Sequence, residues 1–308
     1  LDLARPVREV ARMMQEGDYD LLHTHTPGSA LVGHYAVKRT AKPMVHHVHG
    51  RVDLEQDSVF RNRIGSALQR FSLRHAERVI AVSERTAEYL RESGCDNRRI
   101  RVVPNGVASM QMPRDWQEPR SEWVIGMAAL FRPIKGVEIA IDALARLRAA
   151  GLPVSLRAVG AFEREEYRRE VMSLVAAKGM EKHVVWTGFT RDMDKELARI
   201  DLFIVPSLYG EGLPMVLLEA MSAGVPVVAS SVEGIPNALA YGAAGVLVEP
   251  GNSMLLARAL SELIEKPHQA REFSRIGMQR QREHYSERSM ARQVAAVYRE
   301  LQEEKRAA

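Results

Sequence analysis

Cysteine is almost absent from this chain. The single cysteine among 308 residues, Cys95, excludes a disulfide within the chain. It also excludes a zinc site built from cysteine thiolates, since such sites need several of them. So little cysteine is typical of proteins in a reducing compartment, and we therefore expect this protein in the cytoplasm.

Long apolar runs are absent as well. No stretch reaches the roughly 18 consecutive apolar residues that a membrane-spanning helix requires. The first residues, LDLARPVREV, carry charges and lack the apolar segment of a signal peptide. The chain also starts with Leu1 rather than methionine, from which we expect that residues upstream have been lost or omitted.

Excess charge of one sign is small. The formal net charge is +4, and the whole surplus lies within residues 1–115. Without a basic stretch interleaved with aromatic residues, this surplus argues against a nucleic-acid partner. It is compatible with contact between the N-terminal part and anionic lipid.

What the chain does contain is regular alternation. Hydrophobic residues make up 46% of it, enough for two packed cores, and the length favours two domains. Short apolar runs alternate with helical spacing, which is typical of parallel α/β layers. Prolines and scattered charges interrupt the pattern at residues 109–121. We therefore predict one domain over residues 1–112, a second over 116–284 and a final helix within 285–308.

The densest local signals lie in residues 211–230. Pro214 suits the first position of a helix, where its missing N–H would have gone unbonded. Gly224 can take the left-handed conformation that ends a helix. The apolar residues 225–229 then predict a short strand buried on both faces.

The start of this helix is a candidate anion site. The amides of Met215 and Val216 have no partner within the helix, and with the helix dipole they favour a phosphate. In the loop ahead, Glu211 can accept hydrogen bonds from vicinal sugar hydroxyls. Glu219 lies in an otherwise apolar stretch, where its carboxylate needs donors such as ribose hydroxyls. Alternatively, Glu211 is solvated and Glu219 caps a neighbouring loop.

The wider pattern, E-G-x-P-x-x-x-x-E-A-x-x-x-G-x-P-V-V over residues 211–228, resembles the donor-site signature of the retaining glycosyltransferases of family 4. The resemblance covers nearly the whole chain. It implies an α/β protein of the GT-B fold, with two Rossmann-like domains that face a central cleft and a C-terminal helix that returns to the first domain. Similar enzymes open with a strand and a glycine-rich loop that are missing here, so we expect the first domain to be incomplete.

The resemblance also implies roles for cations and for a histidine. Lys135 precedes a glycine between a strand and a helix, where similar enzymes carry a basic pair that stabilises charge on the leaving diphosphate. Arg132 is the other candidate, although the more common position, five residues before the lysine, is Leu130 here. Both could instead be surface cations. His49 takes the place of a histidine that faces the donor sugar and the attacking hydroxyl.

The remaining residues that the resemblance implies for the donor belong to the signature: Glu211, Gly212, Leu213, Met215, Val216 and Glu219. Similar enzymes usually carry glycine at the position of Glu233, so a loop near the donor is expected to differ.

Two patterns suggest a metal ion at first sight. Five histidines gather at two predicted strand ends: His23, His25, His46, His47 and His49. They have no cysteine or carboxylate at ligand spacing, and we expect packing and capping instead. Asp192 and Asp194 form the D-x-D that binds metal in the unrelated GT-A enzymes, but they lie just before a helix, where aspartate is a favoured cap. We therefore expect no metal ion and no cofactor.

The function that the resemblance implies is transfer of a sugar, from a UDP-sugar donor, to a glycan or lipid-linked acceptor in cell-surface polysaccharide synthesis. Two other classes stay open on the sequence. One is a module that binds a sugar nucleotide without turnover, and the other is a GT-B epimerase or phosphorylase acting on similar ligands.

A basic helix predicted over residues 61–78 offers a second kind of contact. Several cations recur on it at spacings that share a face: Arg61, Arg63, Arg70, Arg74 and Arg78. Phe60, Leu68 and Phe71 lie among them, so the helix could rest on anionic lipid at the inner face of a membrane. The alternative is an ordinary solvated surface.

Overall fold

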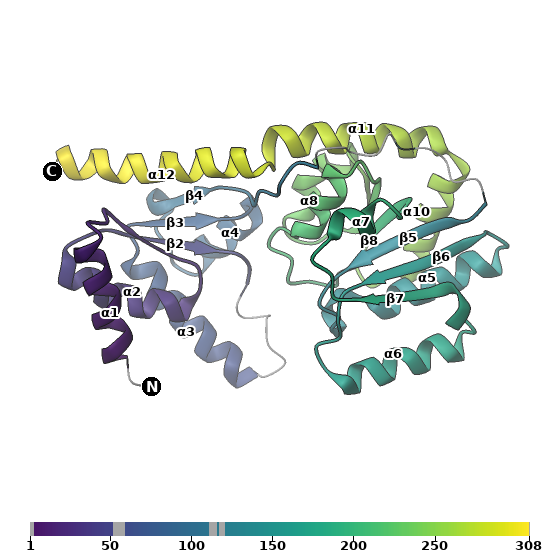
Figure 1. Ribbon diagram of the computed structural model, residues 1–308, viewed down its shortest axis with the longest axis horizontal. Helices are drawn as coiled ribbons and strands as arrows, with labels where there is room; N and C mark the ends of the chain where they lie inside the picture. The colour runs from purple at the N-terminus through teal and green to yellow at the C-terminus, as the bar shows by residue number, and fades with distance from the viewer. Residues whose placement is uncertain (1–2, 52–58, 111–115, 117–120, 308) are drawn as a thin grey trace. The chain divides into compact units, whose positions relative to one another are not determined.

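The computed structural model describes residues 3–51, 59–110, 116 and 121–307, with no side-chain description at residues 59–62. It divides into two compact units, the first made of Leu1–Asn105 with Met290–Ala308 and the second of Gly106–Ser289. Most of the predicted interruption at residues 109–121 lies outside the described residues. Both units are drawn in Figure 1.

The first unit is built around four parallel strands in the order β1-β2-β3-β4. The strands span Leu22–Thr24 (β1), Met44–Val48 (β2), Arg78–Ala81 (β3) and Ile100–Val102 (β4). The helices of this unit are α1 (Ala4–Glu16), α2 (Pro27–Thr40), α3 (Val59–His75), α4 (Glu84–Glu92) and most of α12 (Glu287–Ala307). Helix α2 starts at a capping box in which Thr26 and Ser29 bond each other's backbone.

Helices cover both faces of this sheet. On one face, Met44 belongs to a core that also buries Cys95. Because side chains alternate along a strand, the next residue, Val45, points to the other face. There it packs with Ile80 against Val297 of α12, the yellow helix of Figure 1. The sheet is therefore enclosed, as its nearly continuous apolar strands predict.

One predicted element of this unit is wrong in its extent. The basic helix predicted over residues 61–78 ends at His75, and Arg78 is the first residue of β3. Arg78 is buried, and its guanidinium pairs with Glu300, at 3.2 Å, and with Glu304 of α12. Arg78 is thus an internal anchor for α12 and not a surface cation.

The second unit contains six parallel strands in the order β10-β9-β8-β5-β6-β7. They span Trp123–Ala128 (β5), Val154–Val159 (β6), Val184–Gly188 (β7), Leu202–Val205 (β8), Val227–Ser230 (β9) and Val246–Val248 (β10). The helices are α5 (Val137–Ala149), α6 (Glu165–Ala177), α7 (Met193–Leu197), α8 (Met215–Ser222), α9 (Ile235–Ala238), α10 (Ser253–Glu265) and α11 (Pro267–His284). The predicted parallel α/β class is confirmed in both units.

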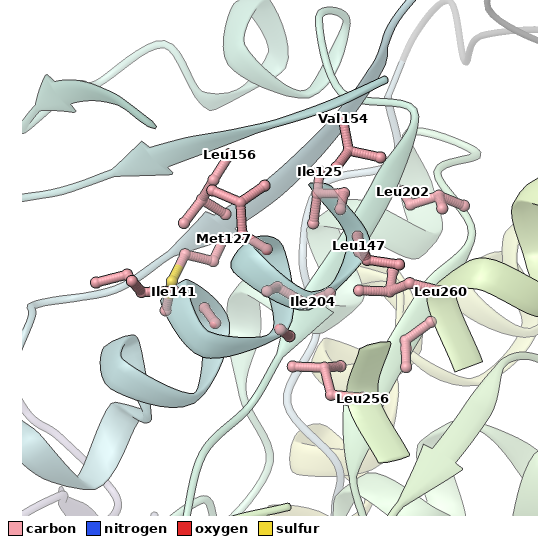
Figure 2. Packing of buried hydrophobic residues seen from close by; sticks show 14 of the residues in the cluster. Ile125, Met127, Ile141, Leu147, Val154, Leu156, Leu202, Ile204, Leu256 and Leu260 are labelled. Atoms are coloured by element: carbon pink, nitrogen blue, oxygen red, sulfur yellow. The ribbon is translucent and has the colours of Figure 1, made fainter. Parts of the chain in front are cut away.

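The core of the second unit joins its central strands to α5 and α10. Figure 2 shows Ile125 and Met127 of β5 and Ile204 of β8 pointing toward Ile141 of α5 and Leu260 of α10. The chain leaves β5 in one direction, through β6 and β7, and then returns to β8 on its other side. Ligands of open α/β sheets bind beside such a reversal, at the carboxyl ends of the strands. The ends of β5 and β8 are therefore the expected place for a site.

No helix in the described part of the chain combines the length and the apolar character needed to cross a membrane.

Candidate active site

A cavity of about 290 Å³ opens at the carboxyl ends of β5 and β8. Its walls come from the residues that follow these two strands and from the start of α8. Five of the predicted site residues line it: Arg132, Lys135, Glu211, Met215 and Val216. Three others do not line it, namely Gly212, Leu213 and Glu219, although all three lie in the same loop and helix.

An ion pair between Lys135 and Glu211 forms part of the wall of this cavity. The Lys135 Nζ donates to Glu211 Oε1 at 2.6 Å, and the Ser207 hydroxyl donates to the same oxygen, also at 2.6 Å. The side chains of Lys135 and Glu211 are only 17% and 9% exposed, so water screens their attraction weakly. Glu211 is therefore not the solvated carboxylate of the alternative interpretation.

Lys135 is held in place by close contact between two loops. It ends a short 3-10 helix, Pro133–Lys135, and Gly136 follows in the left-handed conformation with φ 68°. A Cβ at Gly136 would lie 2.1 Å from the carbonyl oxygen of Pro206, which follows β8. Only glycine fits both this backbone angle and this distance. The lysine is thereby fixed against the end of β8.

Arg132 lines the same cavity with a weaker partner. Its Nη1 lies 3.8 Å from Glu163 Oε1, and its buried Nε has no hydrogen-bond partner among the described residues. Leu130, at the more common position for this arginine, is 50% exposed and also lines the cavity. Arg132 thus keeps donors available for an anion.

Helix α8 presents its first backbone amides to the cavity. Pro214 is the N-cap residue, with φ −68° and ψ 126°, and not the first helical residue as predicted. The reason is its extended ψ, which lets Met215 begin the helix one position later. The amides of Met215 and Val216 still lack intrahelical partners, and the positive end of the helix dipole lies beside them.

Glu219 lies in α8 and is half-buried. No donor among the described residues bonds its carboxylate, which speaks against the interpretation that it caps a neighbouring loop. Burial, and then the negative charge of Asp194, raise the pKa of Glu219. A carboxylate in this position gains from a ligand that brings hydroxyl donors.

Gly212 and Leu213 are both buried in the loop that joins β8 to α8. Glu233, from the neighbouring loop after β9, binds this segment: its Oε1 accepts from the Gly210 amide at 3.1 Å. Glu233 has φ 45°, a backbone conformation that glycine adopts at less cost. The chain thus keeps a conformation suited to glycine but uses a side chain there to hold the loop.

His49 belongs to the first unit, at the end of β2. Its Nε2 lies 3.0 Å from His25 Nδ1, and the Asn105 side chain forms a further hydrogen bond with its ring. Partial burial, and then His25, lower the pKa of His49, so its ring is neutral at physiological pH.

Sequence reasoning missed Ser207. The residue lies two positions after the end of β8 and supplies the second donor to Glu211. Its position after a buried strand, four residues before Glu211, is the signal that could have pointed to it. The D-x-D prediction was right for Asp192, whose Oδ1 accepts from the Lys195 amide at 3.1 Å and caps α7.

Comparison with protein families gives two matches. The family described as "Glycosyl transferases group 1" matches residues 110–280, and the one described as "Glycosyltransferase Family 4" matches residues 1–109. The chain belongs to the glycosyl transferases group 1. The resemblance inferred from residues 211–228 is confirmed.

Curated relatives of this group 1 glycosyltransferase include enzymes that act on inositol derivatives. It is 29% identical to the phosphatidyl-myo-inositol mannosyltransferase of Mycobacterium leprae (strain TN), over 94% of this chain and 75% of that protein. It is 28% identical to the D-inositol 3-phosphate glycosyltransferase of Segniliparus rotundus, over 84% of this chain and 62% of that protein. The chain thus spans less than two thirds of the second relative.

Solved structures show the same fold. The Anabaena Alr3699/HepE protein in complex with UDP-glucose superposes with a TM-score of 0.83 at 26% identity, over 96% of this chain and 82% of that one. The sucrose-phosphate synthase of Thermosynechococcus elongatus superposes with a TM-score of 0.84 at 23% identity, over 97% and 78%. The group 1 glycosyltransferase therefore has the GT-B fold, as predicted.

Proposed function

We propose that this chain transfers a sugar from a nucleoside diphosphate sugar, with UDP as the nucleotide, to a glycan or lipid-linked acceptor, and that the sugar keeps its anomeric configuration. The observation that carries the proposal is one cavity in which a buried Lys135–Glu211 pair, Arg132 and the free amides of α8 meet. Cations and amides suit a diphosphate, and a carboxylate suits sugar hydroxyls.

The donor diphosphate would bind to Lys135, Arg132 and the first amides of α8. Cleaving the sugar from the diphosphate leaves negative charge on the phosphate oxygens, and preorganised donors in a partly dry site stabilise this charge as it develops. Lys135 has three N–H donors, of which Glu211 takes one, so phosphate oxygens can be bound as well. These groups supply positive charge without a metal ion, and we propose transfer that needs no metal and no cofactor.

The sugar would bind to Glu211, and the ribose would bind to Glu219. Both bonds to Glu211 end on Oε1, which leaves Oε2 for a sugar hydroxyl. Gly212 and Leu213 would form the loop beneath the sugar. Glu219, half-buried and without a donor among the described residues, would bind the ribose hydroxyls. His49 would face the sugar and the attacking hydroxyl.

Relatives support the class of donor and acceptor. The Anabaena protein was solved with UDP, with UDP-glucose, and with UDP and glucose. Other relatives are a phosphatidyl-myo-inositol mannosyltransferase and a putative colanic acid biosynthesis glycosyltransferase of Salmonella typhimurium. These names favour a cell-surface glycolipid or polysaccharide as the product. Its synthesis at the cytoplasmic face of a membrane is part of the proposal.

The test combines binding with product analysis. Thermal unfolding with a panel of nucleotide sugars should single out one donor, because a ligand at a hundred times its Kd stabilises the folded state by about 2.7 kcal/mol. Transfer to candidate acceptors should then give a product whose anomeric configuration, read by NMR, matches that of the donor. Inversion would overturn the retaining mechanism. Release of free sugar without acceptor, or dependence on phosphate, would indicate an epimerase or a phosphorylase. Tight donor binding without any turnover would indicate a binding module.

A further inference from the structure

A group of histidines on the first unit lies outside the set of residues proposed for donor binding. His23 and His25 come from β1 and the residue after it, and His47 comes from β2. The register pairs His23 with Val45, so these odd-numbered residues share the sheet face that α12 covers. One ring nitrogen from each of the three histidines lies within 4.8 Å of the other two. The topology thus gathers imidazoles from two strands at one point.

The ring nitrogens in this group are poorly satisfied. His23 Nε2 and both nitrogens of His47 are buried without a hydrogen-bond partner among the described residues. A buried polar nitrogen without a partner costs free energy comparable to a lost hydrogen bond. A ligand bound at this place would account for all three atoms.

The remaining hydrogen bonds leave one lone pair on His23 and one on His25, whose rings are stacked with their centroids 4.4 Å apart. His23 Nδ1 lies 2.5 Å from the Tyr298 hydroxyl of α12, and when it donates there, Nε2 carries the lone pair. His25 Nδ1 lies 3.0 Å from His49 Nε2, and when it donates there, the His25 Nε2 lone pair is likewise available. His49 then carries its proton on the other ring nitrogen, which can donate it to the Asn105 side chain. One assignment of protons therefore keeps the bonds to Tyr298, His49 and Asn105 and leaves one lone pair on each of the three histidines.

We propose that His23, His25 and His47 bind a late first-row transition-metal ion, with zinc as the representative, in a three-imidazole site. Tyr298 and His49 would orient two of the ligands from behind, as hydrogen-bond acceptors commonly do for metal-bound histidines. Neutral imidazole suits zinc, cobalt, nickel and copper, and it does not suit magnesium or calcium, which take oxygen ligands.

The imidazoles can close around such an ion. Zinc–nitrogen bonds of about 2.1 Å in a tetrahedral site bring the ligand atoms to about 3.4 Å from one another, so the rings must move inward. His25 is exposed and can rotate without displacing the core, whereas His47 is fully buried and fixed.

The proposed metal ligands and the cations proposed for the diphosphate belong to different units. All three ligands belong to the first unit, whereas the cations proposed for the diphosphate belong to the second. Binding would, however, fix the tautomer of His25 and with it the proton arrangement of His49. The site therefore has the means to modulate the predicted catalytic histidine without joining the reaction.

Titration of the metal-free protein with Co²⁺ tests the proposal, because bound cobalt absorbs visible light. The wild type should bind one Co²⁺ per chain, and Zn²⁺ should displace it. His25→Gln should weaken binding at least tenfold, and Tyr298→Phe should weaken it by a factor within about 10–100, the usual cost of losing an orienting partner. The matched control is His268→Gln, which removes an exposed histidine of α11 in the other unit.

Two results would overturn the proposal. One is an absence of saturable cobalt binding by the folded wild type. The other is equal affinity in His25→Gln and His268→Gln, which would mean adventitious surface binding. Circular dichroism on each variant keeps a folding defect from being mistaken for a lost ligand. Because the readout is metal binding and not sugar transfer, its outcome is independent of the proposed function.

Discussion

Glu211 and Glu219 differ in what surrounds their carboxylates, and the difference determines how each should respond to mutation. Glu211 accepts from Lys135 and Ser207 inside the cavity, whereas Glu219 lies along α8 with no donor among the described residues. One carboxylate is already held in place for its ligand. The other is poorly satisfied until a ligand arrives.

Glu219→Ala should therefore weaken UDP binding by about 1.5–3 kcal/mol, the range for hydrogen bonds to a charged group. Turnover at saturating donor should largely survive, because ribose is bound equally in the ground and transition states. Glu211→Ala should leave UDP affinity nearly unchanged and lower turnover, since the sugar that it contacts is absent from UDP. Calorimetry with UDP on both variants is the measurement. Equal losses in both, or none in either, would contradict these roles.

Lys135 should be needed both for the fold and for the diphosphate. Lys135→Met leaves the buried Glu211 charge without its partner, which should lower the free energy of unfolding by about 3 kcal/mol. The double variant Lys135→Met with Glu211→Gln removes both charges and should recover most of that loss in urea denaturation. UDP binding should stay weak in both. Recovery of UDP binding in the double variant would show that Lys135 serves only to balance Glu211.

Glu233 permits a test of the loop that it holds. Glu233→Gly relieves the positive φ, worth about 1 kcal/mol, while it removes the bond to the Gly210 amide. Unfolding stability should change little, but the donor KM should rise because the loop before α8 is freer. Glu233→Ala is the matched control: it loses the bond and keeps the strain, so it should be less stable than Glu233→Gly. The reverse order of stabilities would contradict this account.

Among elements, α12 depends on charge as well as on apolar packing. Glu300 of α12 accepts from Arg101 Nε at 2.9 Å and pairs with Arg78 at 3.2 Å. These bonds, chiefly that from Arg101, lower the pKa of Glu300 below its ordinary value of 4.5. The unfolded chain thus takes up the proton first, so the stabilisation is complete above pH 4.5 and is lost as the pH falls through the folded pKa.

Glu300→Gln should consequently lower the urea midpoint at neutral pH and have little effect in acid, once the wild-type carboxyl is protonated. Urea denaturation of both proteins across this pH range is the measurement. Glu303→Gln is the control, since Glu303 is an exposed carboxylate of the same helix. A difference between wild type and Glu300→Gln that persists unchanged at low pH would rule out the ion pairs as its cause.

The helices and strands also show how much of the fold can be predicted from sequence patterns. Short apolar runs predicted the parallel α/β layers, and the glycine and proline signals located α8 to within one residue. The predicted end of α3 was wrong because the neighbouring sequence contains no signal that ends a helix there. The sequence of residues 74–78 is compatible with a helix. In the structure, however, the Glu77 carboxylate accepts from the Met44 amide at 2.7 Å, and this bond holds the chain beside the start of β2. That bond joins residues far apart in the chain.

The same limit applies to the site. The signature residues and Lys135 could be predicted from their motifs, because backbone requirements leave marks in the local sequence. The pairing of Lys135 with Glu211, and the role of Ser207, could not, since they arise where the ends of β5 and β8 meet. The unsatisfied histidine nitrogens are likewise a product of strand register and of α12.

For the whole molecule, the structure leaves fewer surface residues for the predicted membrane contact than the sequence suggests. Arg63, Arg70 and Arg74 of α3 are exposed, whereas Arg78 is internal and Phe71 packs edge-on against the ring of His34. The side chains of Phe60 and Arg61 lie outside the described residues. With fewer cations and no exposed Phe71, we predict weak binding to anionic vesicles that added salt abolishes.

Sedimentation with anionic and neutral vesicles at low salt measures this binding. Replacing Arg63, Arg70 and Arg74 by glutamine should remove the preference for anionic vesicles. The control replaces three exposed arginines of the second unit in the same way: Arg191, Arg271 and Arg282. Equal sedimentation of the wild type with both kinds of vesicle would mean that α3 is an ordinary solvated surface.

The lone cysteine has a practical consequence. Cys95 is 6% exposed within the core of the first unit, and burial raises the pKa of its thiol, so it should resist maleimide reagents. New cysteines at exposed positions, such as Gln15 in the first unit and Arg271 in the second, could then carry a pair of fluorescent dyes without removal of the native thiol. Energy transfer between the dyes would report any change in the distance between the two labelled positions as each substrate binds.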